Sequence, residues 1–164
     1  MKNLYMIGGT MGVGKTTACK LLKRRLDNAV FLDGDWCWDA NPFQVTEETK
    51  AVVVDNICHM LNNFIRCTAY QNIIFCWVMH EQEIIDRILS RLDTRGCAVR
   101  TISLVCSKTA LAHRLQGDID SGIRRPEDIA RSSGRLPLYE KLRTIKIDVS
   151  GLTPVETAER IAAL

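Results

Sequence analysis

The sequence lacks the spacing patterns of a structural metal site or a disulfide framework. Its seven cysteines form no C-x-x-C pair, and its three histidines do not group with them. A zinc site is therefore not expected. The chain also opens without the charged and apolar pattern of a secretory signal, and its cysteine count is odd. Both features favour a reducing environment, so we expect a cytoplasmic protein.

Features of membrane or nucleic-acid binding are also scarce. No apolar stretch approaches the length that spans a bilayer, and the formal net charge is only +3. The single short basic cluster is Lys23–Arg25, which is typical of the end of a solvated helix. We therefore expect neither a membrane nor a nucleic-acid partner, while the oligomeric state stays open. With 164 residues, no repeat and no low-complexity linker, the chain is expected to form one domain over residues 1–164.

A complete phosphate-binding motif lies near the N-terminus. Residues 9–16 read G-T-M-G-V-G-K-T and fit G-x-x-x-x-G-K-[ST] at every fixed position. An apolar run over 4–7 precedes the motif, and a helical pattern over 16–26 follows it, as this loop requires. Its backbone N–H groups and helix N-terminus would hold the phosphates of a nucleoside triphosphate. The predicted nucleotide-binding residues of this loop are Gly9, Gly12, Val13, Gly14, Lys15, Thr16 and Thr17.

Strands and helices alternate along the rest of the chain. Apolar runs predict strands over 4–7, 29–32, 73–78, 98–105 and 145–148. Helical patterns follow over 16–26, from Thr46, over 81–92, over 107–116 and from a capping box at Thr153–Glu156. We expect an α/β three-layer P-loop NTPase fold with about five parallel strands and helices on both faces. Ligands bind at the carboxyl ends of such strands.

Two carboxylates follow the second predicted strand, in the stretch Asp33-Gly34-Asp35. Phosphoryl transfer needs a divalent cation and a group that orients or deprotonates the acceptor hydroxyl. With the Thr16 hydroxyl, Asp33 and Asp35 could bind Mg²⁺, and Asp35 could also act on the acceptor. The alternative is an ordinary polar turn, in which Asp-Gly is common.

A polar segment over about 117–135 is rich in arginine and interrupted by glycine. It contains Arg124, Arg125, Arg131 and Arg135. Guanidinium groups match phosphate oxygens, so we expect a lid that closes over the phosphates. The alternative is a solvated hairpin whose arginines pair with nearby carboxylates, namely Asp118, Asp120, Glu127 and Asp128.

Aromatic side chains lie beside two predicted strand ends. Trp36 and Trp38 follow the second strand, and Trp77 precedes His80 at the end of the third. They could wall a pocket for a flat or sugar-like acceptor, or they could belong to the core. Both interpretations stay open at this point.

Taken together, these motifs resemble the small P-loop kinases of the shikimate, gluconate and adenylylsulfate kinase group. The resemblance rests on residues 9–16, on Phe31–Asp35, on Arg125-Pro126 and on Arg135–Tyr139. It implies ATP and Mg²⁺ as cofactors, with Asp35 on the acceptor hydroxyl and the metal. It also implies a lid role for Arg125 and a position over adenine for Arg114.

The acceptor half of the motif set departs from that group. Residues 78–81 replace the triple glycine of shikimate kinases, and Cys76-Trp77 stands where many relatives have an aspartate. The helix from Thr46 also lacks a counterpart of their acceptor-binding arginine. We therefore do not expect a shikimate kinase.

The resulting hypothesis is transfer of the ATP γ-phosphoryl group to a hydroxyl of a small molecule. Lys15, Asp35 and Arg125 would be catalytic, with help from Arg124. Three alternatives remain: a nucleoside or nucleotide kinase, a phosphotransferase that modifies an antibiotic, and a non-catalytic switch protein that binds ATP.

Overall fold

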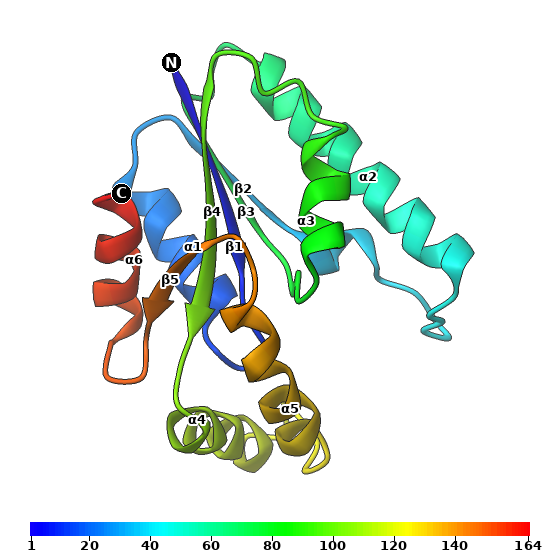
Figure 1. Ribbon diagram of the computed structural model, residues 1–164, viewed down its shortest axis with the longest axis vertical. Helices are drawn as coiled ribbons and strands as arrows, with labels where there is room; N and C mark the ends of the chain where they lie inside the picture. Colours follow the sequence, from blue (N-terminus) through cyan, green and yellow to red (C-terminus); the bar gives the residue numbers. More distant parts are fainter.

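The computed structural model describes residues 1–164 and contains one five-stranded parallel sheet. Its strands are β1 (Lys2–Gly8), β2 (Ala29–Asp33), β3 (Asn72–Cys76), β4 (Cys97–Val105) and β5 (Ile145–Asp148). They follow the order β2-β3-β1-β4-β5, and every neighbouring pair is parallel. The predicted α/β fold with helices on both faces is confirmed (Figure 1).

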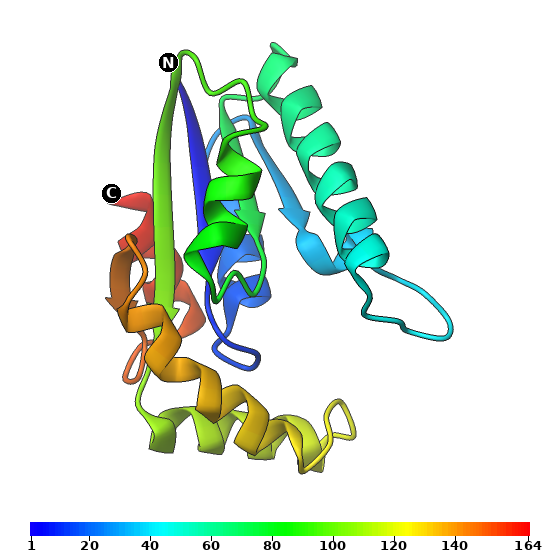
Figure 2. The same ribbon diagram turned by 45° about the vertical axis from the view of Figure 1, so that its right-hand side comes forward.

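Helices cover both faces because the central strands are apolar on both sides. All five residues of β3 are buried, as are Leu4–Gly8 of β1. One face carries α2 (Glu47–Arg66) and α3 (Gln82–Leu89), and the other carries α1 (Lys15–Arg25) and α6 (Pro154–Ala162) (Figures 1 and 2). Each face encloses its own apolar cluster, one built around Ile57, Leu61 and Phe75 and the other around Ile7, Leu22 and Ile161.

Side-chain caps fix two helix starts at the predicted residues. The Thr46 hydroxyl accepts from the Thr49 backbone N–H at 3.1 Å, and the Thr49 hydroxyl accepts from the Thr46 N–H at 2.9 Å. Thr153 and Glu156 form the same reciprocal pair at the start of α6. These caps satisfy N–H groups that a helix leaves unpaired at its start.

Some element boundaries differ from the prediction. The residues after β2 form a short 3₁₀ helix, η1 (Gly34–Cys37), because the Asp33 side chain accepts from the Asp35 N–H and caps it. The irregular segment that leads to α2 therefore begins at Trp38. The helix α3 ends at Leu89, before the predicted end at Leu92. No helix combines the length and hydrophobicity that a membrane-spanning segment needs.

The arginine-rich segment is largely helical, which the sequence pattern did not predict. The helix α4 (Lys108–Asp120) continues beyond Gln116, and α5 (Asp128–Glu140) follows a turn. The buried face of α5 has helical spacing but begins with two polar residues, Asp128 and Ser132, before Leu136 and Tyr139. Gly134 and Pro137, which weaken helices, obscured the pattern further. This α4–α5 hairpin lies beyond the carboxyl ends of the strands (Figure 2).

Candidate functional site

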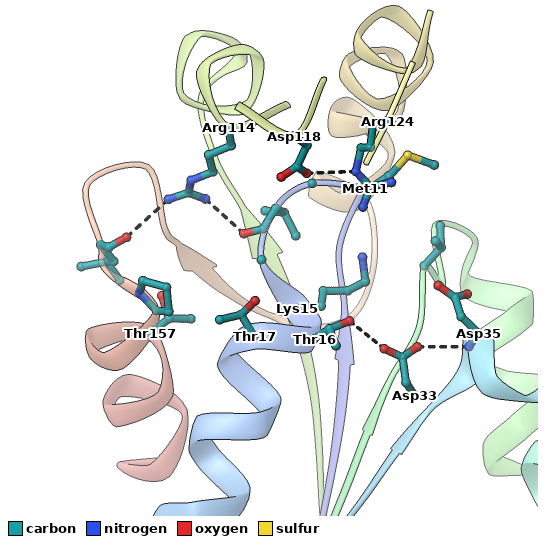
Figure 3. A pocket seen from close by; sticks show the side chains of 16 residues that line it. Met11, Lys15, Thr16, Thr17, Asp33, Asp35, Arg114, Asp118, Arg124 and Thr157 are labelled. Atoms are coloured by element: carbon teal, nitrogen blue, oxygen red, sulfur yellow. Dashed lines mark hydrogen bonds and ion pairs between the residues drawn. The ribbon is translucent and has the colours of Figure 1, made fainter. Parts of the chain in front are cut away.

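A cavity of about 510 Å³ opens at the carboxyl ends of the strands. It is lined by the phosphate-binding loop, the end of β2, the strand-end segment after β3, the α4–α5 hairpin and the start of α6 (Figure 3). Nine predicted site residues line it: Gly12, Val13, Gly14, Lys15, Thr16, Thr17, Asp33, Asp35 and Arg114. Gly9 does not line the cavity; a Cβ there would lie 2.8 Å from Val13 Cγ1, so Gly9 allows the loop to pack tightly.

Glycine is required where the loop turns and approaches α4. Gly12 and Gly14 have φ angles of +83° and +102°, which glycine adopts without strain. A Cβ on Gly12 would also lie 2.4 Å from Cδ2 of Leu115. The loop is thus held against α4 while α1 begins directly after Gly14, as anion binding at a helix N-terminus requires.

Lys15 points into the cavity from the first residue of α1 (Figure 3). Its ammonium donates to the Thr10 backbone oxygen at 3.1 Å. Burial lowers the pKa of Lys15, and the nearby groups of Cys76, Asp35 and Asp33 oppose that shift. A cation that is withdrawn from water and faces an open cavity is suited to binding phosphate oxygens.

Thr16 and Asp33 are joined by a short hydrogen bond beside Lys15. The Thr16 hydroxyl donates to Asp33 Oδ2 at 2.6 Å, and Asp33 Oδ1 accepts from the Asp35 N–H at 3.1 Å. Asp33 itself is only 5% exposed. A hydroxyl and a carboxylate are ligands that Mg²⁺ takes together with phosphate oxygens and waters. No cluster of three or more histidine, cysteine or acidic side chains could hold a metal unaided. The donor set therefore fits Mg²⁺ bound with a nucleotide.

Cys76 ends β3 in register with Asp33 on β2 and with Ile7 on β1. Its side chain is fully buried. The carboxylate beside Thr16 is therefore supplied by β2, one strand away from the position where many relatives have an acid. The site therefore has an acidic side chain beside Thr16 although β3 ends in cysteine.

Asp35 lies at the opposite rim of the same space as Lys15 (Figure 3). Its carboxyl is accessible, but the cavity wall withdraws part of its hydration, and this burial raises its pKa. The charge of Asp33 raises the pKa further, whereas Lys15, the Trp77 indole and Arg124 act in the opposite direction. An accessible carboxylate with a raised pKa is suited to accept a proton.

The arginines occupy different parts of the site. Arg114 on α4 donates to the backbone oxygens of Val13 at 3.1 Å, Leu152 at 3.4 Å and Val149, which fixes the far end of the cavity. Arg124 lines the cavity and donates to Asp118 at 3.0 Å. The predicted Arg125 is not among the lining residues, and its backbone N–H donates to Asp128 in the turn between the helices. Of Arg124 and Arg125, Arg124 is the one that lines the cavity.

The tryptophans divide between the two faces of the sheet. Trp38 and Trp77 are half-buried against the cluster under α2 and α3, with ring centroids 6.3 Å apart. The ring centroid of Phe43, a residue that the sequence did not single out, lies 5.1 Å from that of Trp38. Trp36 instead packs edge-on against Phe31, which belongs to the cluster on the other face.

A buried polar contact that the sequence did not suggest joins α5 to the phosphate-binding loop. Thr10 is fully buried, and its hydroxyl donates to the Ser132 backbone oxygen at 2.8 Å. The Ser132 hydroxyl donates to the Met11 backbone oxygen. The loop and the hairpin are therefore tied together directly below the cavity. No motif links residues so distant in sequence, so only the fold reveals the pair.

We expect Ser132→Ala to lower the free energy of unfolding by about 1–2 kcal/mol, because the Met11 oxygen loses a buried donor. Urea denaturation measures this change. Ser133→Ala is the matched control, since Ser133 is the next residue of α5 and its side chain makes no hydrogen bond. Equal stability of the two variants would contradict the expected role of Ser132.

The chain is similar to several solved kinase structures. A gluconokinase from Sinorhizobium meliloti 1021 shares 16% identity, with 98% of this chain and 94% of the other covered and a TM-score of 0.69. A shikimate kinase from Aquifex aeolicus shares 18%, with 98% and 94% covered and a TM-score of 0.61. A tunicamycin resistance protein from Deinococcus radiodurans shares 21%, with 99% and 95% covered and a TM-score of 0.72.

These likenesses confirm the fold and the predicted resemblance to the shikimate and gluconate kinase group. No curated protein sequence is significantly similar to this chain. The family model described as an AAA domain matches residues 6–132, which include the phosphate-binding loop, both aspartates and the arginines Arg114 and Arg124. Since this match spans well over half of the 164 residues, the chain belongs to the AAA domain family.

Proposed function

We propose that this protein is a phosphotransferase that moves the γ-phosphoryl group of ATP to a hydroxyl of a small molecule. The observation that carries the proposal is the 2.6 Å hydrogen bond between Thr16 and Asp33, with Lys15 and Asp35 on the same cavity. These residues place a metal-binding pair, a phosphate-binding cation and an accessible carboxylate around one space. That is the set of groups that phosphoryl transfer requires.

The nucleotide would lie along the cavity with its base toward Arg114, Leu152 and Pro154. Its phosphates would lie on the N–H groups of the loop and on Lys15. Mg²⁺, held by Thr16 and Asp33, would neutralise charge on the β- and γ-phosphates. Arg124 would add positive charge from the hairpin side, where it already faces the cavity.

Asp35 would take the proton of the acceptor hydroxyl as that oxygen attacks the γ-phosphorus. The bond from the γ-phosphorus to the bridging oxygen breaks, and ADP leaves with that electron pair. Lys15 and Arg124 stabilise the charge that moves onto the phosphate oxygens. The proton on Asp35 returns to solvent after the phosphorylated product leaves.

A nucleotide kinase needs additional cations for the phosphate of its acceptor, and the segment 36–65 contains no arginine. A non-catalytic switch would not need the accessible carboxylate of Asp35. Modification of an antibiotic hydroxyl uses the same chemistry as a metabolic kinase. Its support is a structural neighbour named as a tunicamycin resistance protein, at 21% identity.

The test is ADP release from Mg·ATP with a panel of acceptors. The panel contains sugar acids, polyols, nucleosides, nucleoside monophosphates and hydroxylated antibiotics, and Lys15→Ala is the blank. We expect one class to raise the rate well above the rate without acceptor, with a phosphate ester as the product. A flat response from a protein that binds ATP tightly would favour the switch alternative.

A further inference from the structure

We propose that the acceptor is an uncharged alcohol that presents a flat ring to an aromatic wall formed by Trp38, Phe43 and Trp77. The inference rests on the proposed phosphotransferase function and specifies its substrate class. The wall is built from a loop after η1 and from the strand-end segment after β3. Its inner end, Trp77, lies against Gly34, the residue that precedes Asp35.

Trp77 lies directly against the chain that carries Asp35. A Cβ on Gly34 would lie 2.5 Å from Cγ of Trp77, so only glycine lets the indole approach this closely. The indole N–H is also near the Asp35 carboxyl, where it favours the ionised form. A ring held against Trp77 would thus place an attached hydroxyl close to the proposed base.

The wall extends outward from Trp77 through Trp38 to Phe43. The ring centroids are 6.3 Å apart for Trp77 and Trp38, and 5.1 Å apart for Trp38 and Phe43. Phe43 is 60% exposed, so it contributes little to the core. Val45 and Val52 are exposed in the same part of the chain. Exposed apolar side chains gathered in one short segment favour a binding surface, and aromatic rings pack well against flat ligands.

The charge around the wall disfavours an anionic acceptor. The segment 36–52 carries Asp39, Glu47 and Glu48 but only one cation, Lys50, whose ammonium already binds Glu47 at 2.9 Å. Asp35 adds negative charge at the inner end. On the α5 side, Arg135 makes no ion pair; burial lowers the pKa of His80, and the charge of Arg135 lowers it further. An anionic acceptor would have to bind Arg135 while these carboxylates repel it.

The experiment compares four acceptors that differ in the presence of a flat ring and of negative charge. Uridine carries a flat uncharged ring, ribose has similar hydroxyls without the ring, UMP adds a phosphate, and gluconate is a sugar acid. Phosphoryl transfer is measured by ADP release with Mg·ATP. Binding is measured separately by quenching of tryptophan fluorescence in the presence of Mg·ADP.

The decisive variant is Phe43→Ala, because this exposed ring can be removed without opening the core. Trp36→Ala is the matched control, since Trp36 is similarly exposed at 56% but packs against Phe31 on the other face of the sheet. We expect Phe43→Ala to weaken uridine binding and raise its KM about tenfold, as loss of one stacked ring does. ATP affinity should stay unchanged in both variants.

Preference for uridine over ribose, UMP and gluconate, with the Phe43 effect, would support the inference. Transfer to gluconate or UMP in preference to uridine would overturn the substrate class and leave the phosphotransferase function intact. An equal response to ribose and uridine would overturn the role of the wall. Uridine binding without transfer to any acceptor would overturn the proposed function itself, and neither binding nor transfer would overturn both.

Discussion

Replacing Lys15 by alanine is expected to lower kcat/KM for phosphoryl transfer by a factor on the order of 10³. The ammonium is fixed at the N-terminus of α1, where its bond to the Thr10 oxygen directs it into the cavity. No other lysine lines that cavity, so the charge on the transferring phosphates would lose its nearest compensation. Steady-state ADP release with the best acceptor measures the effect.

The substitution Lys15→Ala should not lower the stability of the folded state. Burial lowers the pKa of Lys15, which means that its charge is held in the fold at a cost. The thermal midpoint of Lys15→Ala should therefore equal or exceed that of the wild type. Lys20→Ala is the control, because Lys20 lies on the exposed side of the same helix. Full activity in Lys15→Ala would remove the catalytic assignment of the phosphate-binding loop.

The elements that the sequence predicted best are those with local signals. The loop 9–16 is fixed by glycines whose φ angles no other residue adopts easily, and two helix starts are fixed by reciprocal caps. The central strands β1 and β3 were visible because most of their residues are buried on both faces and are therefore largely apolar. Asp33 and Asp35 line the predicted site because they lie at the carboxyl end of a strand, where ligands bind in a parallel sheet.

The parts that the sequence did not predict depend on contacts between distant residues. The polar start of α5 is buried because Ser132 meets Thr10 and Met11, more than a hundred residues away. Arg124 rather than Arg125 lines the cavity because the folded α4–α5 hairpin places it against the phosphate-binding loop and the end of β2, which are distant in sequence. The aromatic wall needed the fold as well, since Trp36 and Trp38 are two residues apart but face different layers.

Asp35→Asn is expected to lower kcat by about 10²–10⁴-fold while the affinity for Mg·ATP stays unchanged. The amide has the shape of the carboxylate but cannot accept the proton of the acceptor hydroxyl. Asp33 would still hold the metal with Thr16, because that pair does not involve the Asp35 side chain. Single-turnover transfer and equilibrium binding of ATP separate the two effects.

Asp33→Asn distinguishes the two carboxylates, because it removes charge from the metal-binding pair and should raise the Mg²⁺ concentration needed for half-maximal activity.

The rates of the Asp35 and Asp33 variants should also differ in their dependence on pH. Burial and the charge of Asp33 raise the pKa of Asp35, and only its ionised form accepts a proton. The wild-type rate should therefore fall as the pH decreases through a value above that of an ordinary aspartate, and should be independent of this group at higher pH. Asp35→Asn should lose this fall in rate at low pH, which is the acid limb of the pH profile. Asp33→Asn should keep an acid limb, but at lower pH, because the negative charge that raises the pKa of Asp35 is gone. An unchanged acid limb in Asp35→Asn would assign the proton transfer to another group.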